Sequence, residues 1–273
     1  MLRRAVDAWP IALVAGGIFL LLAVPRAMPQ IEGATYLGSD KCKVCHQKLI
    51  QPPVYDAWAA TLHAKQKAAP DDPPEVKYRY TTGFDPATGQ SVEQGVACED
   101  CHGPGSKHGT AENLTDREKA KATTVRPQQL SPEQQMSLCG ACHSVGEMPT
   151  GEKYPQGFTP GKTLQDLGWK LAADPGTTRL RQYNDMMSSG TRHIENGVTC
   201  VKCHTTHGDI KAPPQLLEPI NALCTQEGCH PPGYEDLKHA EAAGQTVTPD
   251  MTCGDCHMPD KHHIFVPPEH ETK

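Results

Sequence analysis

The sequence predicts a mostly α-helical fold with much irregular loop, built around bound groups that replace most of an apolar core. Three observations support this fold class. The 273 residues include 24 glycines and 25 prolines, which interrupt long helices and strands. They include only four phenylalanines and three tryptophans, so side-chain burial alone offers little to offset the entropy of folding. The twelve cysteines form six spaced pairs, and a histidine follows each pair directly.

The six pairs point to the bound group. Five have the pattern Cys-x-x-Cys-His, and the fifth along the chain, residues 224–230, has four residues between its cysteines. Cys-x-x-Cys-His is the attachment signature of haem c. Two thiols on one helical turn can form thioethers to the two vinyl groups of a haem, and the next histidine becomes the proximal ligand of its iron. The longer fifth motif must bulge to keep both sulfurs on one haem edge.

The sequence therefore predicts six covalently bound haems c. The expected thioether cysteines are Cys42, Cys45, Cys98, Cys101, Cys139, Cys142, Cys200, Cys203, Cys224, Cys229, Cys253 and Cys256. The expected proximal ligands are His46, His102, His143, His204, His230 and His257. A disulfide framework would also use an even number of cysteines, but it would not place a histidine after every second one. Structural zinc would not need six such units, each followed by histidine.

The N-terminal residues 1–30 are expected to form a membrane anchor or an uncleaved signal. Arg3 and Arg4 precede residues 8–24, an uncharged run of 17 residues. This length is at the short end of the window for a membrane-spanning helix, about 17–25 residues. The arginines favour a cytoplasmic N-terminus. We therefore expect a single transmembrane helix in the cytoplasmic membrane, with the haem domain, residues 31–273, facing the periplasm.

Short helices and turns are expected between the motifs. Residues 56–64 read as a helix, and residues 70–97 as a loop or small hairpin. Ser131, Pro132 and Gln134 form a strong helix start, because they combine an N-cap, a proline at the first position and a capping box. Residues 144–190 form the longest stretch without a motif. Two haem lobes could join there.

The remaining histidines are candidates for the distal side of each iron. Six low-spin irons need six distal ligands, and eight further histidines are available. We expect His63, His108, His193, His207 and His239 to serve, with either His262 or His263 as the sixth ligand, at the haem of the sixth motif. His270 lies in a polar tail and is expected to be exposed. Methionine is the rival ligand, and the candidates are Met148, Met186, Met187, Met251 and Met258.

Several segments resemble a known family. Residues 95–108 are similar to the second haem segment of cytochrome c554-like multihaem proteins and of porin-embedded decahaem cytochromes of metal-reducing bacteria. Residues 36–42 and 58–64 resemble the first haem segment of the same proteins, and the likeness to the N-terminal half of the decahaem proteins extends over residues 203–208. It implies bis-histidine haems packed in stacked and perpendicular pairs. This chain departs in having six motifs, a stretched fifth motif and His262–His263 late after the sixth.

Electron transfer along bis-histidine haems is the expected function, and not enzymatic catalysis. The expected partners are redox proteins, including a quinol-linked donor or the other subunits of a respiratory membrane complex. The formal charge of −6 and the absence of a Lys/Arg cluster argue against nucleic acid as a partner. Two alternatives stay open. A reductase or oxidase of a small nitrogen or sulfur compound would need one open iron, and a protomer of a haem filament would not need the anchor.

Overall fold

The computed structural model describes residues 32–188, 192–230, 237–242 and 244–265. The expected membrane segment, residues 8–24, and His270 lie outside these ranges. Within them, no helix combines the length and the apolar character needed to cross a membrane.

Short helices separated by loops make up most of the described chain. The longest helix, α8, has nine residues. The helices are α1 (Ser39–His46), α2 (Tyr55–Ala59), α3 (Leu62–Lys65), α4 (Pro74–Tyr80), α5 (Cys98–His102), α6 (Ala111–Thr115), α7 (Arg117–Ala122), α8 (Pro132–Gly140), α9 (Gln182–Ser188), α10 (Arg192–Glu195), α11 (Ile220–Cys224), α12 (Lys238–Ala242) and α13 (Cys253–His257). The 3-10 helices are η1 (Pro127–Gln129), η2 (Cys200–Lys202) and η3 (Pro259–Lys261). The expected mostly helical and irregular fold class is confirmed.

Two short antiparallel strand pairs complete the fold of the described residues. Strand β1 (Thr81–Thr82) pairs with β2 (Glu93–Gln94), so a hairpin forms within residues 70–97 as expected. Strand β3 (Gly146–Glu147) pairs with β4 (Lys170–Leu171). The sequence reading missed α4, which begins at Pro74 directly after a proline-rich stretch.

The expected capping box at the start of α8 is confirmed. The Ser131 hydroxyl accepts a hydrogen bond from the Gln134 backbone N–H at 3.3 Å, and the Gln134 side chain accepts from the Ser131 N–H at 2.9 Å. The single helix expected over residues 56–64 is instead two helices, α2 and α3. Thr61 caps the second of these with its side-chain oxygen, which accepts from the Ala64 N–H.

A buried apolar cluster joins α8 and α9 to the loop that follows the third motif. Its buried members are Met136, Ala141, Leu164, Trp169, Tyr183 and Met186. A β-carbon on Gly140 would lie 2.5 Å from the Tyr183 ring, so glycine at this motif position lets the two helices approach closely. Residues 144–190 thus contribute to the core around the third and fourth motifs. The division into two lobes stays a prediction.

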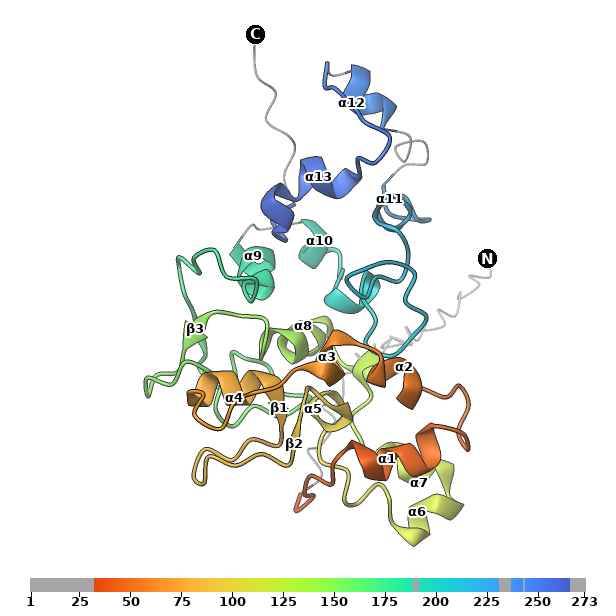
Figure 1. The fold of residues 1–273 in the computed structure, drawn as a ribbon, viewed down its shortest axis with the longest axis vertical. Helices are drawn as coiled ribbons and strands as arrows, with labels where there is room; N and C mark the ends of the chain where they lie inside the picture. The colour runs from red at the N-terminus through yellow and green to blue at the C-terminus, as the bar shows by residue number, and fades with distance from the viewer. Residues whose placement is uncertain (1–31, 189–191, 231–236, 243, 266–273) are drawn as a thin grey trace, which may run out of the picture.

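The motif helices pack two by two. Helix α1 contacts α5, α8 contacts η2, and α11 contacts α13. These pairs contain motifs 1 and 2, 3 and 4, and 5 and 6. Figure 1 shows them following one another along the long axis of the molecule, from α1 and α5 through α8 to α11 and α13. The chain therefore presents its six motifs in sequence order from one end to the other.

Candidate haem-binding site

One continuous cavity of about 3490 Å³ passes along the motifs. It is lined by all six motif histidines and by eleven of the twelve cysteines, with Cys256 the exception. All twelve cysteines are free thiols. A sixth of the cavity is roughly 580 Å³, which lies within the range of a single cofactor site, about 300–1,000 Å³. The cavity is therefore large enough for six groups of cofactor size.

Each motif histidine faces one histidine from elsewhere in the chain. We number the six sites by the motif that supplies the first histidine. Sites 1 to 6 are His46–His108, His102–His207, His143–His63, His204–His263, His230–His193 and His257–His239. The ring centroids of these pairs are separated by 6.0 to 6.3 Å.

This separation fits two imidazoles on opposite sides of one metal ion. With metal–nitrogen bonds of about 2.0–2.1 Å and a ring centroid about 1.1 Å behind the nitrogen, the expected centroid separation is about 6.3 Å. In the described ranges, no three His, Cys, Asp or Glu side chains converge as ligands of a metal ion. Two trans imidazoles leave the four equatorial positions to another ligand, and a porphyrin supplies four nitrogens in one plane. The donor set therefore fits haem iron.

Hydrogen bonds at Nδ1 direct Nε2 of several rings toward the site. The Nδ1–H of His102 donates to the Val125 carbonyl at 2.8 Å, and that of His108 to the Ala120 carbonyl at 2.9 Å. The Nδ1–H of His204 donates to the Pro214 carbonyl at 3.1 Å. A histidine whose Nδ1 carries the proton keeps a lone pair on Nε2, so these contacts select the tautomer that binds a metal.

Burial favours the neutral form of several of the paired histidines. Desolvation lowers the pKa of His63 and of His263 to about 4, with smaller contributions from neighbouring imidazoles. Burial likewise lowers the pKa of His46, His102 and His193. A neutral imidazole is the form that ligates iron, so the protein environment favours the ligating state at neutral pH.

The thiols show how neighbouring sites meet. The thiol of Cys98 raises the pKa of Cys42, that of Cys200 raises the pKa of Cys139, and that of Cys253 raises the pKa of Cys224. In each case the first cysteine of motif 1, 3 or 5 lies close to the first cysteine of the motif that follows it. Sites 1 and 2, 3 and 4, and 5 and 6 are therefore close neighbours, in agreement with the packing of their helices.

The second cysteines connect these pairs of sites. Burial raises the pKa of Cys101 and of Cys142 to about 12, and the Cys142 charge contributes to the shift at Cys101. The Cys229 charge similarly contributes to the raised pKa of Cys203, after desolvation and the Cys200 charge. These contributions place site 2 near site 3 and site 4 near site 5, in agreement with the order of the motif helices along the molecule in Figure 1.

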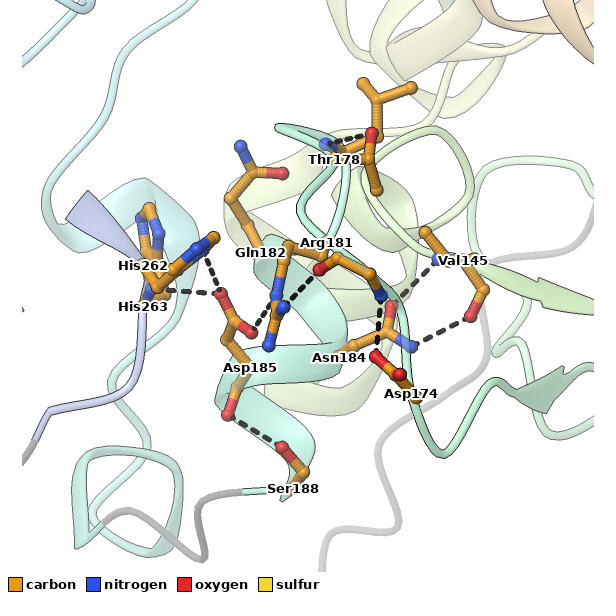
Figure 2. A network of polar contacts seen from close by, with 12 residues as sticks. Val145, Asp174, Thr178, Arg181, Gln182, Asn184, Asp185, Ser188, His262 and His263 are labelled. Carbon is orange, nitrogen blue, oxygen red and sulfur yellow. Dashed lines mark hydrogen bonds and ion pairs between the residues drawn. The ribbon is translucent and has the colours of Figure 1, made fainter. Parts of the chain in front are cut away.

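The structure corrects one expectation about the last site. The second histidine of site 6 is His239, and not His262 or His263. His263 instead faces His204 in site 4. His262 does not face a motif histidine, and its Nδ1 lies 3.4 Å from an Asp185 carboxylate oxygen (Figure 2). The cause is the turn η3, where Asp260 and Lys261 have φ of 54° and 60° and direct the chain back toward α9.

Three of the five candidate methionine ligands are placed by packing or exposure. Met186 is buried in the apolar cluster, and Met148 packs against it. Met187 is 38 % exposed. In all six described pairs, the group facing the motif histidine is another histidine.

Several supporting residues were missed by sequence reasoning. Asp100 and Asp255 occupy the same position in motifs 2 and 6, and each accepts a backbone N–H at the start of its own motif helix, from Ala97 at 2.7 Å and Thr252 at 2.8 Å. Acidic residues in the first turn of a helix are the signal that could have identified them. Gln182, whose side-chain oxygen lies 3.2 Å from His143 Nδ1, carries no such signal.

Comparisons with known proteins agree with this architecture. The sequence is 22% identical over 223 residues to the multiheme cytochrome MtrA of Shewanella baltica (strain OS185), covering 81% of this chain and 46% of that protein. The chain thus spans about half the length of the curated relative that it matches. No model of a known protein family matches the sequence.

Two solved structures are similar. The crystal structure of the outer cell wall cytochrome OcwA matches with a TM-score of 0.60 and 18% identity, covering 84% of this chain and 79% of that one. The undecaheme cytochrome from the S-layer of Carboxydothermus ferrireducens matches with a TM-score of 0.45 and 17% identity over 89% of this chain and 53% of that one. The chain resembles multihaem c-type cytochromes in sequence, and its fold is that of a multihaem cytochrome.

Proposed function

We propose that this protein carries electrons along six bis-histidine haems c. The observation that carries the proposal is the set of six histidine pairs, each of which joins one motif histidine to one other histidine at 6.0 to 6.3 Å. Bound haem c supplies iron that cycles between the ferric and ferrous states and so accepts and releases one electron. The motif cysteines would hold each haem by two thioethers.

The protein would contribute three things to electron transfer: the axial ligands of each iron, the burial of the haems, and their arrangement in a row. With a histidine on both sides, each iron position is filled, which suits electron transfer better than binding of a substrate. The six sites adjoin one another in the order of their motifs, so an electron that enters beside α1 can pass through successive neighbours to α13. The two ends of the row are therefore the natural points of entry and exit.

We further propose that residues 8–24 anchor the chain in the cytoplasmic membrane with the haem domain on the periplasmic side. The uncharged run preceded by Arg3 and Arg4 supports this placement. An anchored carrier would exchange electrons with a quinol-linked membrane partner and with a periplasmic or extracellular acceptor, either alone or as a subunit of a respiratory complex. The charge of the chain is −6, so a partner with a basic docking face is favoured.

The proposal is tested on the full-length protein purified from its membrane fraction. Intact mass and the pyridine haemochrome assay should give six covalent haems per chain. The oxidised protein should show low-spin ferric iron at every site, and the reduced protein should not bind carbon monoxide. A high-spin signal at one site of the wild-type protein would instead favour the reductase or oxidase alternative. An N-terminal mass that shows cleavage before residue 31 would contradict the anchor.

A further inference from the structure

We propose that Asp185 positions His263 as the second iron ligand of site 4. The inference rests on the proposed bis-histidine haems and adds a residue that never touches the iron. His263 lies beyond the sixth motif in the sequence, yet it faces the histidine of the fourth motif. A contact must therefore hold the segment of residues 262–265 against the fourth site. The structure assigns that role to one buried carboxylate on α9.

Asp185 has the burial and the contacts that this role needs. Its side chain is 1 % exposed, and Figure 2 shows the carboxylate between α9 and the C-terminal segment. One carboxylate oxygen accepts from Arg181 Nε at 2.7 Å. The other accepts from the backbone N–H of His263 at 3.1 Å. A buried carboxylate is costly unless it is paired and hydrogen-bonded, and these two contacts satisfy it on both sides.

Helix α9 is a firm support for this contact. The Asn184 side chain accepts from the Val145 N–H and donates to the Val145 carbonyl, both at 2.8 Å. Tyr183 and Met186 belong to the buried apolar cluster. The helix is therefore held both by polar contacts and by packing. A residue that is hydrogen-bonded to Asp185 is held in place with it.

The same helix also serves site 3. The Gln182 side-chain oxygen lies 3.2 Å from Nδ1 of His143, the first histidine of that site. Gln182 and Asp185 are three residues apart, and such residues lie on one side of a helix. One face of α9 thus orients a ligand in each of two neighbouring sites, whose motif helices, α8 and η2, pack against each other.

Phe265 also anchors residues 262–265, by apolar packing. Phe265 packs against the buried cluster, and its ring lies 4.4 Å from that of His193. Phe265 fixes the segment two residues beyond the ligand, whereas Asp185 fixes the backbone of the ligand itself. Loss of the Asp185 contact should therefore loosen His263 while the segment stays attached.

The test uses binding of carbon monoxide to the reduced, haem-loaded protein, because carbon monoxide binds ferrous iron only where an axial ligand has left. His263→Ala is the reference variant and should bind one carbon monoxide per chain. The Asp185→Asn side chain has one acceptor oxygen, whereas both Arg181 Nε–H and the His263 N–H need an acceptor. This variant should therefore bind carbon monoxide at site 4 at least tenfold faster than the wild type. Its ferric spectrum should lose intensity from the same low-spin signal that His263→Ala removes.

Two further variants separate positioning from loss of charge or misfolding. Asp174→Asn makes the same substitution at an exposed residue of the loop before α9 and should behave as the wild type. Arg181→Gln combined with Asp185→Asn removes the partly buried arginine charge, which loses its carboxylate partner in Asp185→Asn alone. The freed amide can then again accept from the His263 N–H, so the double variant should bind carbon monoxide more slowly than Asp185→Asn.

Each outcome decides something. If His263→Ala retains its haems but stays closed to carbon monoxide, the assignment of His263 to site 4 in the proposed function fails. If His263→Ala opens while Asp185→Asn matches the wild type in both rate and spectrum, the role of Asp185 is overturned. If Asp174→Asn opens as readily as Asp185→Asn, the effect is a general loosening and the inference again fails.

Discussion

At the scale of single residues, the histidines show what the sequence can and cannot reveal. Their chemistry can be read from the sequence, but their geometry cannot. The motif histidines are identified by their cysteines alone. The choice between His262 and His263 depends on a turn with two positive φ values, at Asp260 and Lys261, where non-glycine residues are uncommon. No local pattern announces such a turn, so two adjacent histidines of equal chemistry could not be told apart in advance.

The orientation of the paired rings predicts two electronic classes of iron. The planes are close to perpendicular in site 3, at 89°, and in site 5, at 72°. In sites 1, 2, 4 and 6 they lie within 33° of parallel. Contacts explain the two exceptions, since Gln182 orients the His143 ring and the Phe265 ring packs edge-on against His193.

We expect the electron paramagnetic resonance spectrum of the oxidised protein to show this division. Perpendicular imidazoles leave two iron orbitals nearly equal in energy and give a strongly anisotropic signal with a low-field line, whereas near-parallel imidazoles give a rhombic signal. Spin quantitation should assign two irons to the first class and four to the second. Six rhombic signals would contradict the ring orientations of sites 3 and 5.

At the scale of elements, local sequence signals predicted where helices begin better than they predicted how far helices extend. The capping box at Ser131 correctly gave the start of α8, because its hydrogen bonds are made between neighbours in the sequence. The helix expected over residues 56–64 is divided at Thr61, whose side chain caps the second half. Helix α4 was missed because Pro73 and Pro74 read as a loop, although proline is well suited to the first turn of a helix.

We expect the buried Glu99 side chain to hold α5 against residues 37–38, which lie just before α1. Its side chain is 2 % exposed and accepts backbone N–H groups from Leu37, Gly38 and Gly105 at 2.7 to 3.0 Å. Glu99→Gln replaces one acceptor oxygen by a donor, which leaves at least one buried N–H unpaired. We expect the free energy of unfolding to fall by about 1–3 kcal/mol.

Denaturant unfolding of the haem-loaded protein, followed by far-UV circular dichroism, measures this loss. Glu112→Gln is the matched control, because Glu112 is 74% exposed and pairs only with Lys119 at the surface. Its effect should stay within about 0.5 kcal/mol. Equal effects of the two substitutions would show that the Glu99 contacts do not hold α1 and α5 together.

At the scale of the whole molecule, the pairing of histidines joins segments that are distant in the sequence. Site 3 joins His143 to His63 on α3, and site 2 joins His102 to His207 beyond the fourth motif. The sequence offers six attachment motifs and a sufficient number of second histidines, because both are properties of composition and spacing. It could not predict which histidine serves which motif, because that depends on how the whole chain folds back.

This interlocking predicts that loss of one haem loosens a remote segment. In Cys139→Ala/Cys142→Ala the haem of site 3 is no longer attached, so the iron bond that ties His63 to His143 is lost or weakened. Helix α3 has four residues, too few to be stable alone. Its remaining contacts include the bond from the Val96 N–H to the His63 carbonyl at 2.9 Å and the approach of the Gln215 side chain to His63 Nδ1 at 3.3 Å. We therefore expect amide hydrogen exchange at residues 62–65 to accelerate at least tenfold.

The matched variant is Cys253→Ala/Cys256→Ala, which detaches the haem of site 6. Its second histidine, His239, lies on α12, so exchange should rise at residues 238–242 and stay unchanged at residues 62–65. Hydrogen exchange followed by mass spectrometry resolves both segments in one experiment. If both variants loosened only the residues next to their own motifs, the second histidines would not be carrying the long-range connections, and the row of sites would be held together by the packing of the motif helices alone.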